Sequence, residues 1–528
     1  MAVPRRSIRW LLAGALAIVL VLVAAYLVPR LGADDGVVRS SGATATARAL
    51  NWQPCDDAAD QQCAFLPVPK SWDNPGGGTF RLHMRRLPAQ PATPGDAKLG
   101  SLIINTGGPD IASSGYEMEH TYGVLRELRA KFDLVWPDPR GTGKSEPQLQ
   151  RCSQDPLLDR QQPAAGPFSW PQATAFRINQ QTPSAAECLR LNPVDGKLIG
   201  TREVVRDVDA IRQALGEDKI TYLGYSYGTR LGTQYAKTFP ARVRAMVLDG
   251  TVDPSGTVLG LGQTMSAGDP LTAQLVRGSL SPQMQTVYDD VVRYLQTAII
   301  KQRNIFDGTT IDNTRWTFGW NLGYWAAGTP SAKLADGVQA DVCELARAAG
   351  LPSTPCPVES DEVATPTPPQ ELADLTAAAD ASGPVNLSPA RWLINCADLS
   401  GRPDADAIAS LMPAADQPET PLPASFLMVY AAMCSGYPDA WAPIGPMTPV
   451  ADGPTPLFVN GTTDPATPLG GARAMQRYFP GARMVTLPTA QHGIFPGAKS
   501  ACVNAAVTSY LISGTSPAAD LDCPTATP

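Results

Sequence analysis

The chain has 528 residues, 44% of them hydrophobic and 17% charged, so it can build a large core and is neither disordered nor fibrous. Its 42 basic and 49 acidic residues give a net charge of -7. This balance argues against a nucleic-acid-binding protein, which needs a basic surface to neutralise phosphates. The 51 prolines and 46 glycines indicate many turns. At about 150 residues per domain, the length suggests about three units.

The N-terminus has the pattern of a targeting segment. Three arginines within the first nine residues precede an uncharged apolar run over residues 10–28. A helix of this length rises about 28 Å, close to the hydrocarbon thickness of a bilayer, whereas a signal-peptide core has about 7 to 15 residues. We expect a signal anchor over residues 1–33, with a cleaved signal peptide as the alternative, and then a linker over residues 34–49. Either segment leaves the main body outside the cytoplasm, membrane-anchored or secreted.

The ten cysteines are spread along the chain without a C-x-x-C pair or a neighbouring histidine cluster. This spacing argues against zinc and iron–sulfur sites, and no metal ligands are predicted. An even number of cysteines in an exported chain favours disulfides, each contributing about 2 to 4 kcal/mol. The sequence does not fix their connectivity, but nearest-neighbour pairing predicts Cys55–Cys63, Cys152–Cys188, Cys343–Cys356, Cys396–Cys434 and Cys502–Cys523.

After the linker, short apolar runs alternate with helical patterns. Val204, Val208, Ile211 and Leu215 are spaced as on one face of a helix. This alternation predicts an α/β fold with a mostly parallel sheet covered on both faces. Buried strands are expected at residues 102–105, 134–136, 220–223, 246–248, 457–460 and 484–487.

Residues 255–445 break this rhythm. They contain helical patterns such as residues 284–296, a proline-rich stretch over residues 351–370 and four of the ten cysteines. We interpret this stretch as an inserted, mainly helical cap domain with a loop-like proline-rich piece. The core is then formed by residues 50–254 and 446–528.

The clearest chemical signal is a G-x-S-x-G motif formed by Gly224, Ser226 and Gly228. A predicted strand precedes it and a helix ending before Pro240 follows it, which is the context of a nucleophile elbow. Glycines two residues before and after the serine leave the room that a tight turn requires. The helix N-terminus directs N–H groups towards an oxyanion formed when Ser226 attacks a carbonyl. A simple glycine-rich turn is the alternative.

A serine nucleophile needs a base, and the chain has three histidines. His83 lies in an alternating pattern typical of a strand and has two arginines close by. His120 lies in a pattern typical of a surface helix. His492 follows the predicted strand at residues 484–487, in the kind of loop that carries chemistry in α/β proteins, so it is the preferred base.

The triad acid is expected between the serine and the histidine, the chain order of α/β-hydrolases. Asp464 follows the strand at residues 457–460 and is preferred, and Asp249 is the rival. An Asx turn before Pro465 is a further role that Asp464 can combine with catalysis. For the oxyanion hole we predict the N–H of Tyr227 and that of Gly108 or Gly107, in the NTGGPD loop.

The motifs NTGGPD, PDPRGTGKS, LGYSYGT, LDGTVDP, NGTTDPATP and QHG together resemble the secreted tripeptidyl-aminopeptidase branch of the prolyl-iminopeptidase-like α/β-hydrolases of actinobacterial cell envelopes. The resemblance covers about residues 50–525 and implies an α/β-hydrolase fold with an inserted cap. It assigns the triad to Ser226, Asp464 and His492. The chain departs from the family's glycine-rich run at Thr106 and Asp110. An acid at this place would repel an anionic substrate or attract a cationic amine.

Together these observations predict an extracytoplasmic serine hydrolase that works through an acyl-enzyme and needs no metal or organic cofactor. The resemblance implies an aminopeptidase whose cap binds the free amine of a peptide substrate. A cell-envelope esterase or lipase using the same triad is the alternative, and a catalytically inactive anchored binding protein is a third hypothesis. The membrane is the only other expected partner, and the oligomeric state stays open.

Overall fold

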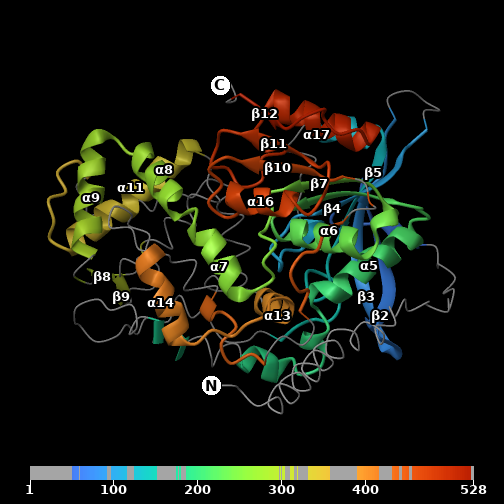
Figure 1. The fold of residues 1–528 in the computed structure, drawn as a ribbon, viewed down its shortest axis with the longest axis horizontal. Helices are drawn as coiled ribbons and strands as arrows, with labels where there is room; N and C mark the ends of the chain where they lie inside the picture. Colours follow the sequence, from blue (N-terminus) through green and yellow to red (C-terminus); the bar gives the residue numbers. More distant parts are fainter. Residues whose placement is uncertain are drawn as a thin grey trace, which may run out of the picture. The chain divides into compact units, whose positions relative to one another are not determined.

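A ten-stranded, mostly parallel sheet lies at the centre of the fold (Figure 1). The computed structural model describes residues 50–58, 60–91, 97–115, 124–150, 174–175, 178–179, 186–295, 298, 300–303, 310–313, 318, 331–356, 389–415, 431–438, 443–450, 453 and 455–524. The sheet strands are β1 Gln53–Pro54, β2 Gln62–Ser71, β3 Asn74–Leu87, β4 Gly100–Asn105, β5 Phe132–Pro137, β6 Ile220–Tyr225, β7 Val243–Asp249, β10 Leu457–Gly461, β11 Arg483–Leu487 and β12 Leu521–Asp522.

The strand order is β1-β2-β3-β5-β4-β6-β7-β10-β11-β12. From β5 to β12 all neighbours are parallel, whereas β1, β2 and β3 pair antiparallel and add an edge next to β5. The carboxyl ends of the parallel strands therefore lie along one edge of the sheet, where α/β proteins build their sites.

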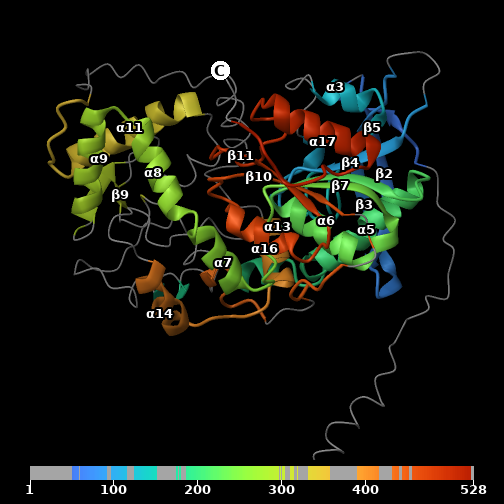
Figure 2. The same ribbon diagram turned by 45° about the horizontal axis from the view of Figure 1, so that its top comes forward.

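Helices cover both faces of this sheet (Figures 1 and 2). On one face a hydrophobic cluster joins the strands to α5 Thr201–Ala214, α6 Tyr227–Thr238, α13 Pro389–Asp398 and α16 Leu469–Gln476. On the other face a second cluster joins them to α3 Val124–Arg129 and α17 Ala501–Ser513. The remaining elements are η1 Ser113–Gly115, η2 Asp195–Lys197, η3 Pro240–Arg242, α7 Val258–Ser266, α8 Asp269–Ser279, α9 Pro282–Leu295, α11 Ser331–Ala348, α14 Ala405–Ala415, and the two-stranded β8 Ile300–Arg303 and β9 Thr310–Asn313.

Neighbouring residues of a central strand belong to opposite cores. Tyr222 packs in the cluster with α6, and Leu223 packs in the cluster with α17. Met246 and Val247 divide in the same way. This is why these strands appear in the sequence as continuous apolar runs. All six predicted strands are confirmed, as are α5 and the end of α6 before Pro240.

Of the two longest described strands, β2 was not predicted, and β3 was anticipated only through the alternating pattern around His83. β2 contains Pro67 and Pro69, and β3 begins with the segment Asn-Pro-Gly-Gly-Gly. Proline and glycine weaken a strand assignment because proline donates no ladder hydrogen bond. The hairpin fits because it lies at the sheet edge, where β2 is flanked only by the two-residue β1.

The segment interpreted as one insert divides between two hydrophobic cores. α8, α9 and α11 form a third cluster of their own, which includes Cys343 and Cys356. In contrast, α7 and α13 contribute to the first sheet cluster through residues such as Val258 and Leu393. Helices α7 and α13 of the insert therefore pack into the hydrophobic core on one face of the main sheet.

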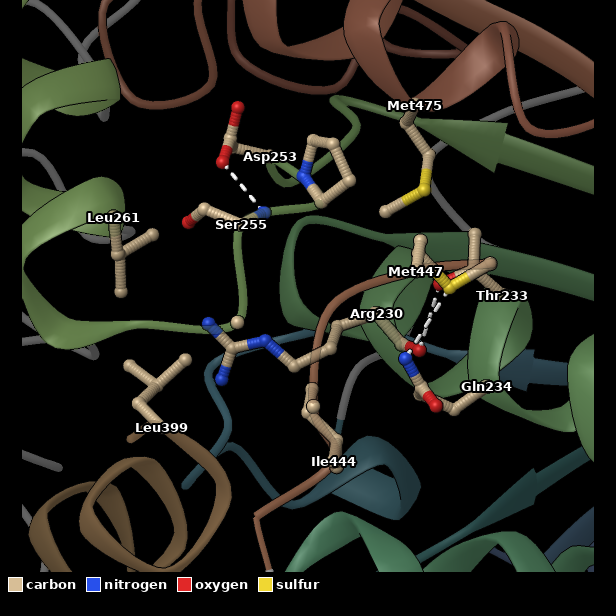
Figure 3. Close-up of a pocket in the computed structure, with 13 residues that line it drawn as sticks. Arg230, Thr233, Gln234, Asp253, Ser255, Leu261, Leu399, Ile444, Met447 and Met475 are labelled. Carbon is tan, nitrogen blue, oxygen red and sulfur yellow. Dashed lines mark hydrogen bonds between the residues drawn. The ribbon is translucent and has the colours of Figure 1, made fainter. Parts of the chain in front are cut away.

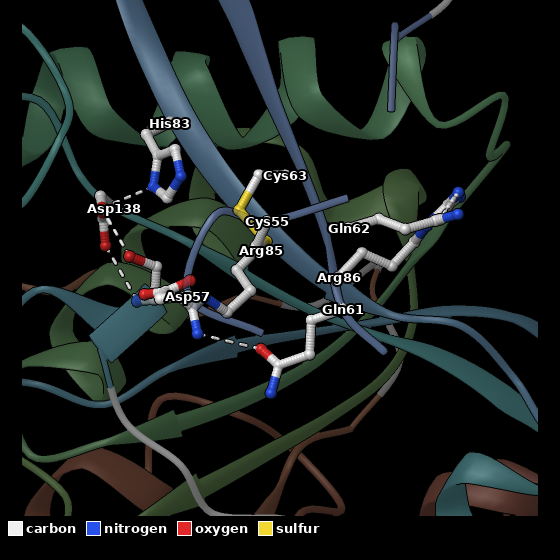
Figure 4. Close-up of a disulfide and its surroundings, with 10 residues drawn as sticks. Cys55, Asp57, Gln61, Gln62, Cys63, His83, Arg85, Arg86 and Asp138 are labelled. Carbon is white, nitrogen blue, oxygen red and sulfur yellow. Dashed lines mark hydrogen bonds and ion pairs between the residues drawn. A yellow bond between two sulfur atoms is a disulfide. The ribbon is translucent and has the colours of Figure 1, made fainter. Parts of the chain in front are cut away.

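Four of the predicted disulfides are present: Cys55–Cys63, Cys343–Cys356, Cys396–Cys434 and Cys502–Cys523. Figure 4 shows the first, which ties the segment after β1 to β2. Cys152 lies outside the described residues, so the pair Cys152–Cys188 stays a prediction. The predicted anchor, the linker and most of the proline-rich stretch also lie outside them. Within the described ranges, no helix is both long and apolar enough to cross a bilayer.

Candidate active site

Ser226 lies in the turn between β6 and α6. Its backbone has φ 52° and ψ -119°, a conformation that L residues rarely adopt and that tertiary contacts must hold. Its N–H donates to the carbonyl of Asp249 at the end of β7 (3.0 Å), and its own carbonyl accepts from the N–H and the hydroxyl of Thr229. As a whole, the residue is partly exposed. The turn therefore presents the Ser226 hydroxyl at the carboxyl end of the sheet.

The flanking glycines have no room for a side chain. A Cβ at Gly224 would lie 2.5 Å from the carbonyl oxygen of Gly228. A Cβ at Gly228 would lie 2.7 Å from the Asn105 side-chain oxygen. Both contacts are far shorter than van der Waals distance, so the elbow requires glycine at both positions.

His492 lies in the loop after β11, and its Nδ1 is 2.8 Å from Oδ2 of Asp464 in the loop after β10. Asp464 is fully buried, and its other oxygen accepts from the N–H groups of Ala466 and Thr467, both at 2.9 Å. One carboxylate oxygen thus closes an Asx turn while the other orients the imidazole. Asp464 therefore combines the Asx turn expected before Pro465 with a contact to the imidazole.

Thr467 is a site residue that sequence reasoning missed. Its hydroxyl donates to Asp464 Oδ2 at 2.9 Å and lies 3.3 Å from His492 Nδ1. The Asp464 carboxylate therefore receives three hydrogen bonds besides the imidazole contact, and these hold it in place. A threonine three residues after a candidate acid, just past a proline, was the available signal.

Asp249, the rival acid, lies beside the histidine loop without contacting the imidazole by a hydrogen bond. Its two oxygens accept from the N–H groups of Ile494 (3.1 Å) and Phe495 (2.7 Å). The next residue, Gly250, lies so close that a Cβ there would be 3.0 Å from the His492 ring. Asp249 thus holds the loop that carries His492, while its carbonyl holds the N–H of Ser226.

Electrostatics in this cluster favour the imidazolium form of His492. Burial lowers the pKa of His492, but the charge and hydrogen bond of Asp464, with a contribution from Asp249, outweigh it and raise this pKa above the ordinary value of 6.5. Burial raises the pKa of Asp249 to about 7, against the two N–H groups that stabilise its anion. The site therefore holds two groups whose pKa values lie above their ordinary values.

The NTGGPD loop lies against the nucleophile. A Cβ at Gly107 would be 2.8 Å from the Tyr225 carbonyl oxygen and 3.0 Å from Cβ of Ser226. The N–H of Gly107 donates to the Asn105 side chain at 3.1 Å. The hydrogen bonds found in the described part of the chain do not include one between Ser226 and His492. In unliganded enzymes such contacts often tighten only when substrate binds.

Asp110, in the same loop, forms an ion pair. Its Oδ1 accepts from Nε of Arg391 on α13 at 2.8 Å, and its side chain is only 10% exposed. The acid that departs from the family pattern therefore contacts a cation supplied by the insert.

The other two histidines are elsewhere. His83 lies on β3, is 1% exposed and contacts Asp138 through Nδ1 at 3.0 Å (Figure 4). Asp138 also accepts from the N–H and hydroxyl of Ser114 in η1. The pair belongs to the PDPRGTGKS turn, where Arg140 is fully buried beside Asp207. His120 lies outside the described residues.

A small pocket lies beside α6, lined in part by Arg230, Gln234, Asp253 and Leu399 (Figure 3). Arg230 donates to Asn395 of α13 at 2.8 Å. The pocket therefore lies close to the contact between α13 and α6, the helix that follows Ser226. In the residues that can be described, no group of three or more His, Cys, Asp or Glu side chains is arranged to hold a metal ion.

Comparison with known proteins identifies the family. Residues 100–335 match the alpha/beta hydrolase fold family, and residues 421–523 match the TAP-like protein family. The chain is 31% identical over 519 residues to serine protease Hip1 of Mycobacterium tuberculosis, covering 90% of this chain and 91% of that one. It is 27% identical to the tripeptidyl aminopeptidase of Streptomyces lividans (92% and 89% covered). It is also 29% identical to carboxylesterase B of Mycobacterium tuberculosis (93% of each covered). The chain belongs to the TAP-like branch of the α/β-hydrolase family.

Proposed function

We propose that this protein is a serine hydrolase that releases short peptides from the free N-terminus of a peptide substrate through an acyl-enzyme on Ser226. The observation that carries the proposal is the pair formed by buried Asp464 and partly exposed His492, together with a glycine-flanked serine in a strained elbow at the same edge of the sheet. This is the constellation of nucleophile, base and orienting acid used in acyl transfer.

The proposed steps follow from the contacts. Asp464 accepts a hydrogen bond from Nδ1–H of His492, so the free lone pair of the neutral ring is on Nε2. Nε2 takes the Ser226 proton as the hydroxyl attacks the carbonyl, and the imidazolium then protonates the leaving amine. In the second half-reaction, water attacks the acyl-enzyme with His492 again as the base.

The proposed oxyanion hole consists of the N–H groups of Tyr227 and Gly108. Tyr227 begins α6, so its N–H belongs to the unsatisfied first turn of a helix. The N–H of Gly107 is engaged by Asn105, which favours Gly108 as the second donor.

The relatives support a peptide substrate. Two that align over nine tenths of this chain are named a serine protease and a tripeptidyl aminopeptidase. We assign binding of the free peptide amine to the insert, residues 255–445, which would act as a cap. A cell-envelope esterase is the second candidate, and the specific observation in its favour is the similarity to carboxylesterase B over 93% of the chain.

The disulfides indicate an extracytoplasmic protein, because such bridges persist in oxidising compartments. We further propose that residues 1–33 anchor the chain in the membrane. Fractionation of cells, with N-terminal sequencing of the mature protein, separates an anchored chain from a secreted one. A mature protein that begins after residue 33 in the soluble fraction contradicts the anchor.

The function is tested with purified protein on three substrate sets: peptides with a free N-terminus, the same peptides acetylated, and short- and long-chain esters. We expect cleavage of the free peptides and about 10³-fold or greater loss on acetylation or in Ser226→Ala. Thr257→Ala, which removes a hydroxyl that caps α7, is the folded control. Equal cleavage of free and acetylated peptides contradicts the aminopeptidase hypothesis. Ester hydrolysis without peptide cleavage supports the esterase hypothesis instead.

A further inference from the structure

Helix α13 comes from the insert but is built into the catalytic core. It packs against α5 and η2, and its residues from Trp392 to Asp398 are buried in the first sheet cluster or beside it. The disulfide Cys396–Cys434 ties it to a second segment of the insert. α13 is therefore a rigid element held from several sides.

At its N-terminal end, α13 contacts the loop of the proposed oxyanion hole. Arg391 donates to Asp110 at 2.8 Å, and these side chains are 30% and 10% exposed. Asp110 lies two residues after Gly108, and a Cβ at Gly108 would be 2.4 Å from the Asp110 N atom. The ion pair is largely shielded from solvent, so it restrains the loop more than a surface pair would.

At its C-terminal end, α13 contacts the other side of the hole. Asp398 accepts from the N–H (2.7 Å) and hydroxyl (2.6 Å) of Thr201, the first residue of α5. The Thr201 oxygen lies 2.6 Å from the Tyr227 hydroxyl. Because Thr201 donates its only proton to Asp398, the Tyr227 hydroxyl donates to Thr201. Burial, reinforced by the nearby Asp398, raises the pKa of Tyr227, so this donor stays protonated.

Resting on the proposed function, we infer that α13 is a brace for the oxyanion hole, in which Arg391 positions Gly108 through Asp110 and Asp398 positions Tyr227 through Thr201. None of these four side chains needs to touch the substrate: they act by fixing two N–H donors at the distance that the oxyanion requires. The insert would then contribute to the chemical step as well as to substrate access.

The test measures kcat and KM separately on the best peptide substrate. Asp110→Asn, Arg391→Gln and Thr201→Val each lower kcat about 10-fold to about 100-fold with KM nearly unchanged. In the double variant Asp110→Asn/Arg391→Gln, kcat falls no further than in either single variant, whereas in Asp110→Asn/Thr201→Val the two fold-decreases multiply. Arg391→Lys and Thr201→Ser recover part of the activity. Arg190→Gln, which removes the exposed Arg190–Glu187 pair outside the insert, keeps kcat.

A second readout separates positioning from general damage. A peptide aldehyde places a hemiacetal oxyanion in the hole, so its affinity should fall in parallel with kcat, while the affinity of the product peptide stays constant. Full kcat in the Asp110 and Thr201 variants, or a raised KM with unchanged kcat, overturns the brace. Loss of aldehyde and product affinity together also overturns it. Activity retained in Ser226→Ala contradicts the proposed function instead.

Discussion

At the residue scale, the site depends on His492 lying near two buried carboxyl groups with different tasks. Asp464 contacts the imidazole directly, and Asp249 acts through the backbone N–H groups that follow it. Both raise the pKa of His492. One acid orients the ring and the second adds negative charge nearby, and together they raise the pKa of His492 above 6.5.

The pH profile of kcat/KM should show this tuning. Neutral His492 is the base, so activity is lost as the pH falls through its raised pKa, and the acid limb lies above pH 6.5. Asp249→Asn removes one source of negative charge, which lowers the pKa of His492 and moves the limb to lower pH. Because Asp249 itself has a pKa of about 7, the limb in the unaltered enzyme belongs to the coupled pair.

Asp464→Asn is the comparison for this experiment. It removes the negative charge that touches the imidazole and no longer selects the useful tautomer, so it should also lower kcat by about 10⁴-fold, as for other triads. Profiles from about pH 5 to about pH 9 on a peptide with a free N-terminus suffice to compare the limbs. An acid limb that stays in place in Asp249→Asn contradicts the charge effect, and a profile flat to about pH 4 contradicts His492 as the base.

The sequence was sufficient to predict the contact between Asp464 and His492 and to expect Ser226 at the same edge of the sheet, because each residue follows a recognisable strand in the expected chain order. It was insufficient for Asp110 and Arg391, which are 281 positions apart and meet only through tertiary packing. Thr467 was missed for a different reason: its role depends on a turn geometry that the residue types alone do not show.

At the element scale, the sequence predicted parallel buried strands better than the edge hairpin. Runs such as β6 and β10 are apolar on both faces, and this signal is local. β2 and β3 carry prolines and glycines that argue against a strand, and only their position at the edge makes the pairing acceptable. The packing of α13 against the main core could not be predicted from the sequence either, because a helical pattern does not show which surface the helix packs against.

Removing the disulfide at α13 should therefore affect catalysis. Cys396→Ala/Cys434→Ala opens a loop of 38 residues and should lower the free energy of unfolding by about 4 kcal/mol. It also loosens the brace, so kcat should fall with little change in KM. Cys343→Ala/Cys356→Ala removes a bridge of the separate α8, α9 and α11 cluster and should leave kcat unchanged. Equal kcat in the two double variants, measured well below both melting temperatures, contradicts the link between α13 and the oxyanion hole.

At the scale of the whole molecule, the described chain contains a large core on both faces of the sheet and a separate cluster formed by α8, α9 and α11. The composition break at residue 255 predicted an insert, but it could not show that one part joins the main core and another part does not. We interpret the α8, α9 and α11 cluster as the independent part of the proposed cap. Such a part can open without unfolding the sheet.

Hydrogen exchange on two core variants tests this division. Leu345 is 3% exposed on α11, and Leu223 is fully buried on β6. Truncation of either leucine to alanine should cost about 2 to 5 kcal/mol at its own site. In Leu345→Ala, backbone amides of α9 and α11 should lose protection while those of β6 and β7 keep it, and Ser226 should still form its acyl-enzyme. In Leu223→Ala the loss should reach β6, β7 and α17 together, because these elements share one cluster. If Leu345→Ala weakens protection in β6 and α9 equally, the insert and the sheet unfold as one unit and the cap has no opening motion of its own.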